Sequence, residues 1–407
     1  MTDVRVPNGS HIRLGRVEGD LVADGEVTVD PESESGVVVT GTVRLDGSAT
    51  INASLECGAL RVRRGTTRVR GSLLSHGEVE AEKATVVVEK EFTATRVDVD
   101  KRLEVGGTVK AERVEVGGEF DARGAVTAEM VDVGGRLHVE GLLTSRDVDV
   151  GGAAELATVE LEKIDVGGSV VLDHGRILHQ ASTGGTFEAR GALEFGSIRV
   201  GGLVRLGPDS HGGVVEVGGK LNAAGNFGFS SLEIGGLGDI VGSATGDSVE
   251  IGGQLTVGGG LKLSGALEVG GRIRIGGVLE ALSLEIGGQL RAQKAVVADD
   301  AEIGGSVETQ EGLRARRVEL SRRSEAHGPL VGDRVELGRK SQAESVFGRE
   351  VEVGDDCTVR EVVGDLVTLG DGARVGRVRY VKELRVGRST QVAQPPEHVS
   401  TLPPFPL

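Results

Sequence analysis

Apolar residues recur along this chain with a period of about seventeen residues. Within one period, apolar or small side chains tend to occupy positions 1 and 3, then 7 and 9, then 13 and 15. The period that begins at Val114 has Val114, Val116, Phe120, Ala122, Val126 and Ala128 at these positions. Such alternation is typical of strands with one buried face, so each period predicts three short strands.

The pattern is maintained over almost the whole sequence. Two further examples are Val249, Ile251, Leu255, Val257, Leu261 and Leu263, and Leu284, Ile286, Leu290, Ala292, Val296 and Ala298. Position 1 falls at Ile12, Val27, Val43, Leu60, Val79, Val97, Val114, Val131, Val148, Ile164, Ala181, Ile198, Val215, Leu232, Val249, Leu267, Leu284, Ala301, Val318, Val335, Val351, Val367 and Leu384. This series predicts roughly 23 coils.

We therefore predict an all-β fold, a single long three-sided parallel β-helix in which each strand pairs with the same strand of the next coil. The β-solenoid is expected over residues 12–392, less regular in 12–96, highly regular in 97–310 and poor in Gly pairs in 311–392. Residues 1–11 are expected as a lead-in and 393–407 as a Pro-rich tail. Local irregularity is expected at His174–Ser182 and at Arg205–Val214, the latter with a bulged corner at Gly207–Ser210.

A Gly pair follows the first strand of many coils, as in Val131-Asp132-Val133-Gly134-Gly135. We expect a tight corner there, with glycine supplying positive φ. A phosphate-binding loop would occur once and precede a helix, whereas this motif recurs about every seventeen residues. The glycines therefore indicate architecture and no nucleotide site.

Composition supports a narrow interior without aromatic packing. The chain has 67 Gly, no Trp, one Tyr and 8 Phe, so Val, Leu, Ile and Ala must fill the core. The formal charge of -16 disfavours nucleic acid or anionic lipid as a partner for the whole surface. The acidic excess, with Arg as the main base, resembles salt-adapted proteins. Because no signal-peptide pattern or long apolar segment is seen, we expect a cytoplasmic protein.

Position 2 carries an acidic residue in most coils. The regular series, here called the acidic ladder, is Glu115, Asp132, Asp149, Asp165, Glu216, Glu233, Glu250, Glu268, Glu285 and Glu302. Like charges one strand apart repel, and salt screens that repulsion. The ladder is expected either to aid solubility in concentrated salt or to bind a cation or a protein partner.

The chain offers little recognisable catalytic chemistry. The seventeen-residue period argues against a trimeric hexapeptide-repeat enzyme, and the long inserted loops of β-helix polysaccharide lyases are missing. Of the eight histidines, five fall at positions that share no face: His138, His174, His179, His211 and His327. Cys57 and Cys357 lie at inward positions on distant coils, so we expect neither a disulfide nor a zinc site. We predict no catalytic, metal or cofactor site, no small-molecule substrate and no enzymatic activity.

A seventeen-residue, Val- and Gly-rich solenoid of this kind resembles the bactofilins, and the composition is similar to their haloarchaeal relatives. The five-residue segments that carry the resemblance are Val-Glu-Val-Gly-Gly at Val114 and at Val215, and Leu-Glu-Val-Gly-Gly at Leu267. The latter two are followed by the apolar residues Leu221 and Ile273. The resemblance covers residues 12–392. It implies a right-handed β-helix that joins end to end without nucleotide, forming filaments that act as scaffolds at the membrane or envelope and in cell shape.

The two ends decide whether a solenoid polymerises, because a terminal coil exposes strand edges unless it is capped. Prolines in the tail cannot donate to a ladder, so the tail either folds back as a cap or hangs free as a ligand. The candidate interface or cap residues are Ile12, Leu14, Leu384, Val386, Pro395, Pro396 and Phe405. The expected function is a self-assembling scaffold, in the cytoplasm or at the inner face of the membrane. The alternative is a monomeric adaptor that binds a protein through the acidic ladder or the tail.

Overall fold

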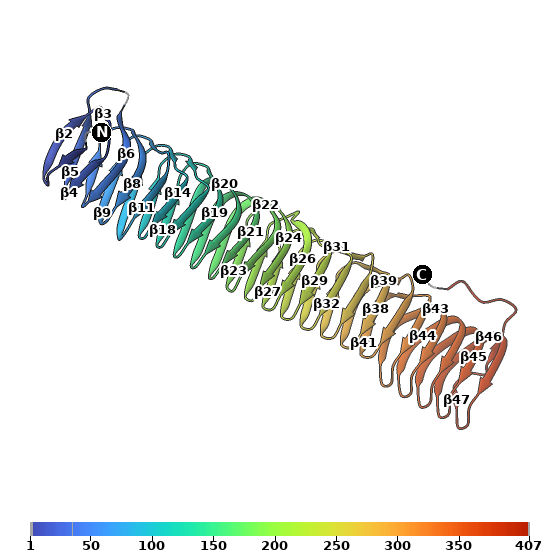
Figure 1. Cartoon of the computed structure of the whole chain (residues 1–407). Helices are drawn as coiled ribbons and strands as arrows, with labels where there is room; N and C mark the ends of the chain where they lie inside the picture. The colour runs from blue at the N-terminus through green and yellow to red at the C-terminus, as the bar shows by residue number, and fades with distance from the viewer. Residues whose placement is uncertain (1–2, 35, 406–407) are drawn as a thin grey trace. The chain divides into compact units, whose positions relative to one another are not determined.

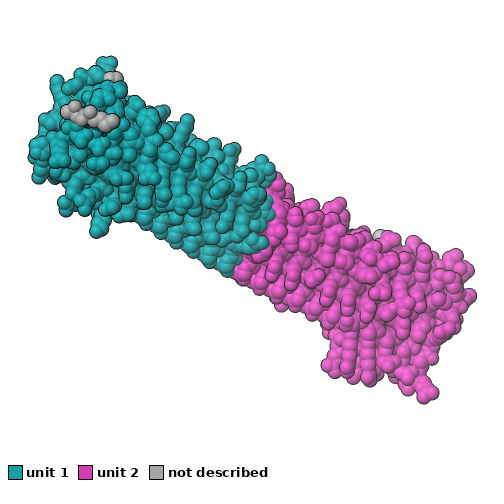
Figure 2. Space-filling model, viewed as in Figure 1, with its two compact units in different colours: residues 1–202 teal, residues 203–407 magenta. Residues whose placement is uncertain are grey.

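The computed structural model describes residues 3–34 and 36–405, and these contain strands and no helix. The chain divides into two compact units, residues 1–202 and 203–407 (Figure 2). Each unit is a parallel β-solenoid whose coils stack one on the next (Figure 1). The predicted fold class is confirmed.

The strands of the first unit are β1 (Val4–Val6), β2 (Ser10–Leu14), β3 (Arg16–Val17), β4 (Leu21–Asp24), β5 (Val27–Pro31), β6 (Val37–Asp46), β7 (Ala49–Ile51), β8 (Leu55–Val62), β9 (Gly65–Val69), β10 (Leu73–Ser75), β11 (Glu78–Ala81), β12 (Ala84–Val88), β13 (Phe92–Thr93), β14 (Arg96–Val99), β15 (Arg102–Val105), β16 (Val109–Lys110), β17 (Arg113–Val116), β18 (Glu119–Ala122), β19 (Val126–Val133), β20 (Arg136–Val150), β21 (Ala153–Val166), β22 (Ser169–Thr183), β23 (Thr186–Ala189) and β24 (Leu193–Val200).

The strands of the second unit are β25 (Leu203–Leu206), β26 (His211–Val217), β27 (Lys220–Ala223), β28 (Phe227–Gly228), β29 (Ser231–Ile234), β30 (Leu237–Ile240), β31 (Ala244–Gly246), β32 (Ser248–Ile251), β33 (Gln254–Val257), β34 (Leu261–Leu263), β35 (Ala266–Val269), β36 (Arg272–Ile275), β37 (Val278–Ala281), β38 (Ser283–Ile286), β39 (Gln289–Val297), β40 (Asp300–Ile303), β41 (Ser306–Arg314), β42 (Arg317–Leu320), β43 (Glu325–Leu337), β44 (Gln342–Val353), β45 (Thr358–Leu369), β46 (Arg374–Val386), β47 (Gln391–Val392) and β48 (Glu397–His398).

Pairing between coils follows the predicted period. The equivalent strands of successive coils form three stacked series, here called columns. In the first column Val97 lies beside Val114, and Val114 beside Val131, all in parallel. The six inward residues of the Val114 coil, from Val114 to Ala128, are all buried. Equivalent side chains therefore stack on one another along the interior and form a continuous apolar core.

The N-terminal coils differ from the prediction. Val43 pairs with Leu21, and Leu21 with Val4, so the first sheet column continues through these residues. Val27 and Ile12, predicted at position 1, instead lie in the second column. The loop after β5 lengthens this coil, which shifts every earlier position. Parallel pairing begins at Val4, inside the segment expected as a lead-in.

One predicted core pair is also wrong. In the coil that begins at Leu284, the buried residues of the third strand are Ala295 and Val297, whereas Ala298 is exposed. The register shifts after Ala292, because the corner before the third strand is one residue shorter than expected. A one-residue slip moves every following side chain to the opposite face.

The Gly pairs serve close packing between coils rather than unusual torsion angles. Neither Gly134 nor Gly135 has a positive φ, in contrast to the prediction. A Cβ built on Gly135 would lie 2.5 Å from the carbonyl oxygen of Gly118 in the preceding coil. The corners stack so tightly that the backbone itself fills the space of a side chain.

Candidate functional site

The C-terminal coil leaves part of its interior open. Its first-column strand, Glu383–Val386 of β46, pairs with β45 on one side. Val386 lies at an inward position, yet its side chain is 52% exposed, and Leu384 is half-buried. In the preceding coil the equivalent residues Val367 and Leu369 are buried. This end therefore presents an apolar surface beside an uncovered strand edge.

The N-terminal coil is similarly open. Ile12 of β2 pairs with buried Val29, but Ile12 itself is only half-buried because no earlier coil covers it. Leu14 is half-buried beside Pro31. Both predicted interface residues therefore lie on the second strand of the first coil.

The tail, residues 393–407, folds back on the second unit in the part that the structure describes, up to residue 405 (Figure 1). β47, just before the tail, pairs with Arg374–Val375, and β48, within the tail, pairs with Arg379–Tyr380, both on the outer edge of β46. Pro395 and Pro396 lie in the exposed link between these short strands. Of the two alternatives considered for the tail, the structure shows the folded-back one.

The tip of the tail packs on an apolar site on the outside of the solenoid. Val331, Phe347 and Val363, here called the docking site, are neighbours on β43, β44 and β45. Leu402 and Phe405 pack against them, and the rings of Phe405 and Phe347 have centroids 6.0 Å apart. Phe405 also lines a groove of about 580 Å³ that continues towards Val297 and Arg314.

The docking site is not among the predicted site residues, although the sequence contains a pattern that indicates it. Leu330-Val331-Gly332, Val346-Phe347-Gly348 and Val362-Val363-Gly364 place two adjacent apolar residues before a glycine in three successive coils. Only one of two adjacent strand residues can point inward. The second apolar residue therefore required a partner on the outer face.

The acidic ladder forms two runs of directly neighbouring carboxylates. Glu115, Asp132, Asp149 and Asp165 follow one another in the first unit, and the run ends at Ser182. In the second unit the run consists of Glu216, Glu233, Glu250, Glu268, Glu285 and Glu302. The predicted ladder residues are therefore adjacent in space within each unit.

Two carboxylates of this ladder, Asp149 and Glu115, have pKa values shifted in opposite directions. Burial raises the pKa of Asp149, and the carboxylates of Asp132 and Asp165 raise it further. Burial also acts to raise the pKa of Glu115, but hydrogen bonds and charges from Arg113 and Arg96 outweigh it and lower that pKa. The pKa of Glu115 is therefore lowered by adjacent arginines, whereas Asp149 has only carboxylates beside it in the ladder and its pKa is raised.

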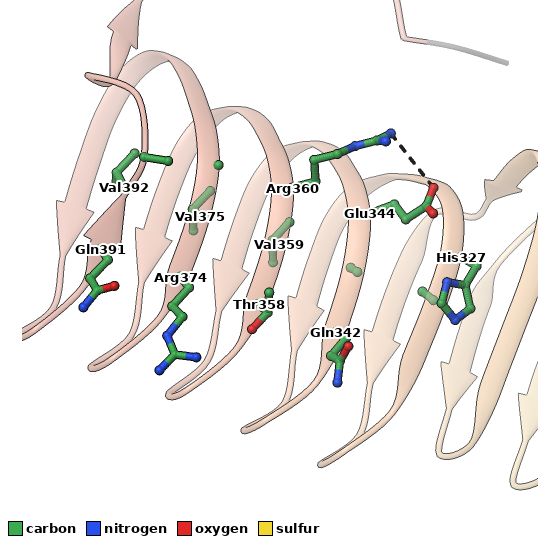
Figure 3. A pocket seen from close by; sticks show the side chains of 14 residues that line it. His327, Gln342, Glu344, Thr358, Val359, Arg360, Arg374, Val375, Gln391 and Val392 are labelled. Carbon is green, nitrogen blue, oxygen red and sulfur yellow. Dashed lines mark ion pairs between the residues drawn. The ribbon is translucent and has the colours of Figure 1, made fainter.

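A groove of about 690 Å³ runs across the coils near the C-terminal end (Figure 3). Figure 3 shows Arg374 and Thr358 on one side, and Arg360 and Glu344 joined by an ion pair of 4.0 Å on the other. The floor is formed by small apolar residues such as Ala343 and Val359. The lining offers hydrogen-bond donors and acceptors for an extended chain, without a nucleophile paired with a base.

The cysteines and titratable clusters give no metal-binding arrangement. Cys57 and Cys357 are both buried free thiols, and burial raises the pKa of Cys57 to about 11. Across residues 3–34 and 36–405, no group of three or more His, Cys, Asp or Glu side chains is placed to hold a metal ion. Over the same residues, no helix has the length and apolarity needed to span a membrane.

Comparison with known proteins gives no relative: no family model, curated protein or solved structure matches this chain.

Proposed function

We propose that this protein is a non-enzymatic structural element that joins end to end into filaments and acts as a scaffold. The observation that carries the proposal is the open C-terminal coil, where inward Val386 remains 52% exposed beside an unpaired strand edge. The half-buried Ile12, in the second column, gives the N-terminal coil an apolar surface of its own. Exposed edges of this kind are templates for pairing with another chain.

The parallel architecture gives the contact a direction. A parallel solenoid presents different edges at its two ends, so the C-terminal edge of one copy is suited to the N-terminal edge of the next. A contact between two different surfaces does not close on itself unless rotation brings it into a ring. Repeated joining therefore favours an open filament, without any nucleotide. The resemblance to bactofilins supports the same proposal, including a role in cell shape.

Electron microscopy of the purified full-length protein across a potassium chloride series tests this function. We expect filaments whose length increases with salt, since salt screens the net negative charge of the chain. Uniform single particles at every salt and protein concentration would refute end-to-end assembly.

A monomeric adaptor is the second candidate, and the second-unit ladder favours it. Among the ion pairs of the described residues, none involves Glu233, Glu250 or Glu268. Such a stripe has the charge to meet a basic protein surface. Retention of a basic partner by monomeric protein, lost after Glu250→Gln and Glu268→Gln, would select this function over the filament.

A further inference from the structure

The tail occupies strand edges that a following coil would use. On β46, the amide of Ala393 donates to the carbonyl of Val375 at 2.9 Å, and the amide of Val399 donates to the carbonyl of Tyr380 at 2.9 Å. These bonds satisfy backbone groups on the second and third strands of the coil that precedes Glu383–Val386. The first-column strand that ends at Val386 stays uncovered on its outer side. The tail is therefore a partial cap.

The tail itself is a poor template for another coil. Pro395 and Pro396 separate β48 from β47, and Pro403 and Pro404 follow β48. Proline has no amide hydrogen to donate to a ladder. The prolines therefore leave only β47 and β48, of two residues each, for a second copy to pair with.

The docking site is a local specialisation of the surface. In the coils before the docking site the same row contains Lys262, Glu280 and Arg314, which suit a solvated face, and the half-buried Val296. Under the tail they are replaced by Val331, Phe347 and Val363, which are at most 7% exposed. Apolar residues at these outward places are stable only when something covers them, and Leu402 and Phe405 do so.

We propose that the docking site is a peptide-binding site for the Leu402–Phe405 tip, and that the docked tail is a displaceable cap on the C-terminal edge. Docking of the tip holds β48, and through it β47, on the edge of β46. Release of the tip frees the edge for the first coil of a second copy. The capping step rests on the proposed end-to-end assembly, whereas peptide binding does not.

Hydrogen exchange of the full chain tests whether the docked tip holds the tail on β46. Variants that weaken this docking are here called latch variants. The variant Leu402→Ser with Phe405→Ala, and separately Phe347→Thr, should exchange the Ala393 and Val399 amides about tenfold faster or more. Threonine is chosen because Thr245 lies in the same row of an earlier coil. Thr401→Ala, at an exposed position of the same tail, should leave both rates unchanged. Unchanged rates in both latch variants would overturn the proposal.

A synthetic peptide of residues 397–407 tests binding in trans. Added to the Leu402→Ser/Phe405→Ala protein, the peptide should bind and slow exchange at the docking-site strands. The same peptide with Phe405→Ala should bind at least tenfold more weakly. Equal binding of the two peptides, or no binding of either, would refute a peptide site.

Light scattering of the same samples separates the latch from the filament. We expect the latch variant to assemble several-fold faster than the unmodified chain. If the unmodified chain forms filaments and the latch variant forms them no faster, capping is wrong. If neither protein assembles while exchange rates respond as expected, the filament function fails and the peptide site remains supported.

Discussion

At the scale of single residues, the glycines show that space between coils, rather than torsional freedom, limits which side chains the corners accept. In the pair Gly287-Gly288, a Cβ on Gly287 would meet its nearest atom at 3.8 Å. A Cβ on Gly288 would lie 2.6 Å from the carbonyl oxygen of Gly270 and closer still to that of Gly271. Within this pair, only the second glycine must lack a side chain, whereas the first has space for a methyl group.

We expect Gly288→Ala to lower the free energy of unfolding by about 1–3 kcal/mol, because the new methyl group forces adjacent coils apart. Gly287→Ala is the matched control and should be neutral or stabilising by up to about 1 kcal/mol, since alanine restricts the unfolded chain. Urea unfolding followed by circular dichroism measures both. Equal destabilisation by the two substitutions would contradict the packing argument.

The buried thiol of Cys57 should make stability fall at alkaline pH. Its pKa is about 11 in the folded protein against an ordinary value of 9.0. The unfolded thiol ionises first as pH rises from 9 to 11, so this contribution is present below pH 9 and lost across that window. Cys57→Ala should remove about 1–3 kcal/mol of the pH dependence. Thermal unfolding of both proteins between pH 8 and about 11 provides the measurement.

At the scale of strands and sheet columns, the acidic ladder combines strained and stabilised carboxylates. Asp149 lies between two other aspartates, Asp132 and Asp165. Glu115 accepts hydrogen bonds from Arg96, at 3.2 Å, and from Arg113. One column therefore contains groups whose ionisation has opposite effects on folding.

Asp149→Asn should raise the free energy of unfolding by about 0.2–1 kcal/mol at pH 7 and low salt, because it removes repulsion across strands. The pKa of Asp149 is raised, so the folded state binds its proton more tightly. The penalty of its charge is therefore absent at low pH and develops as pH rises through that pKa. The gain from Asn should shrink on acidification and in about 1 M salt. Denaturant unfolding at several pH values measures it.

Glu115→Gln provides the contrasting control. Its lowered pKa means that ionised Glu115 stabilises the fold, and this contribution is lost as pH falls through the lowered pKa. The substitution should therefore destabilise the protein at pH 7 by a few tenths of a kcal/mol, with the loss disappearing in acid. Effects of the same sign for Asp149→Asn and Glu115→Gln would contradict this account.

The sequence predicts the strand columns well where coil length is constant and poorly where it changes. Alternation alone identified the buried residues of the Val114 coil, since pairing repeats at a fixed interval. The loop after β5 and the short corner before Ala295 change the interval, and alternation alone does not reveal the change. The contact between Phe405 and Phe347 is not predicted from the sequence for a related reason. Phe405 lies beyond the repeat, so no fixed interval relates the two residues.

At the scale of the whole molecule, the two open coils are the surfaces through which copies are expected to meet. Val386→Glu should abolish assembly, because a carboxylate would enter an apolar contact without a partner. Val386 is already 52% exposed, so stability should change by less than about 1 kcal/mol. Val241→Glu, at a site 64% exposed away from either end, is the control and should assemble normally. Sedimentation and melting curves measure both, and normal assembly of Val386→Glu would count against the interface.

The seventeen-residue spacing of partners has a consequence for how the protein is made. Val114 needs only Val97 and Val131 to complete its place in the sheet, and no residue far along the sequence. A nascent chain can therefore add one finished layer for every seventeen or so residues synthesised, without waiting for its C-terminal end. The layers before β46 can form while β47 and β48 are still unmade, so the edge of a growing solenoid is uncovered until those strands have been synthesised.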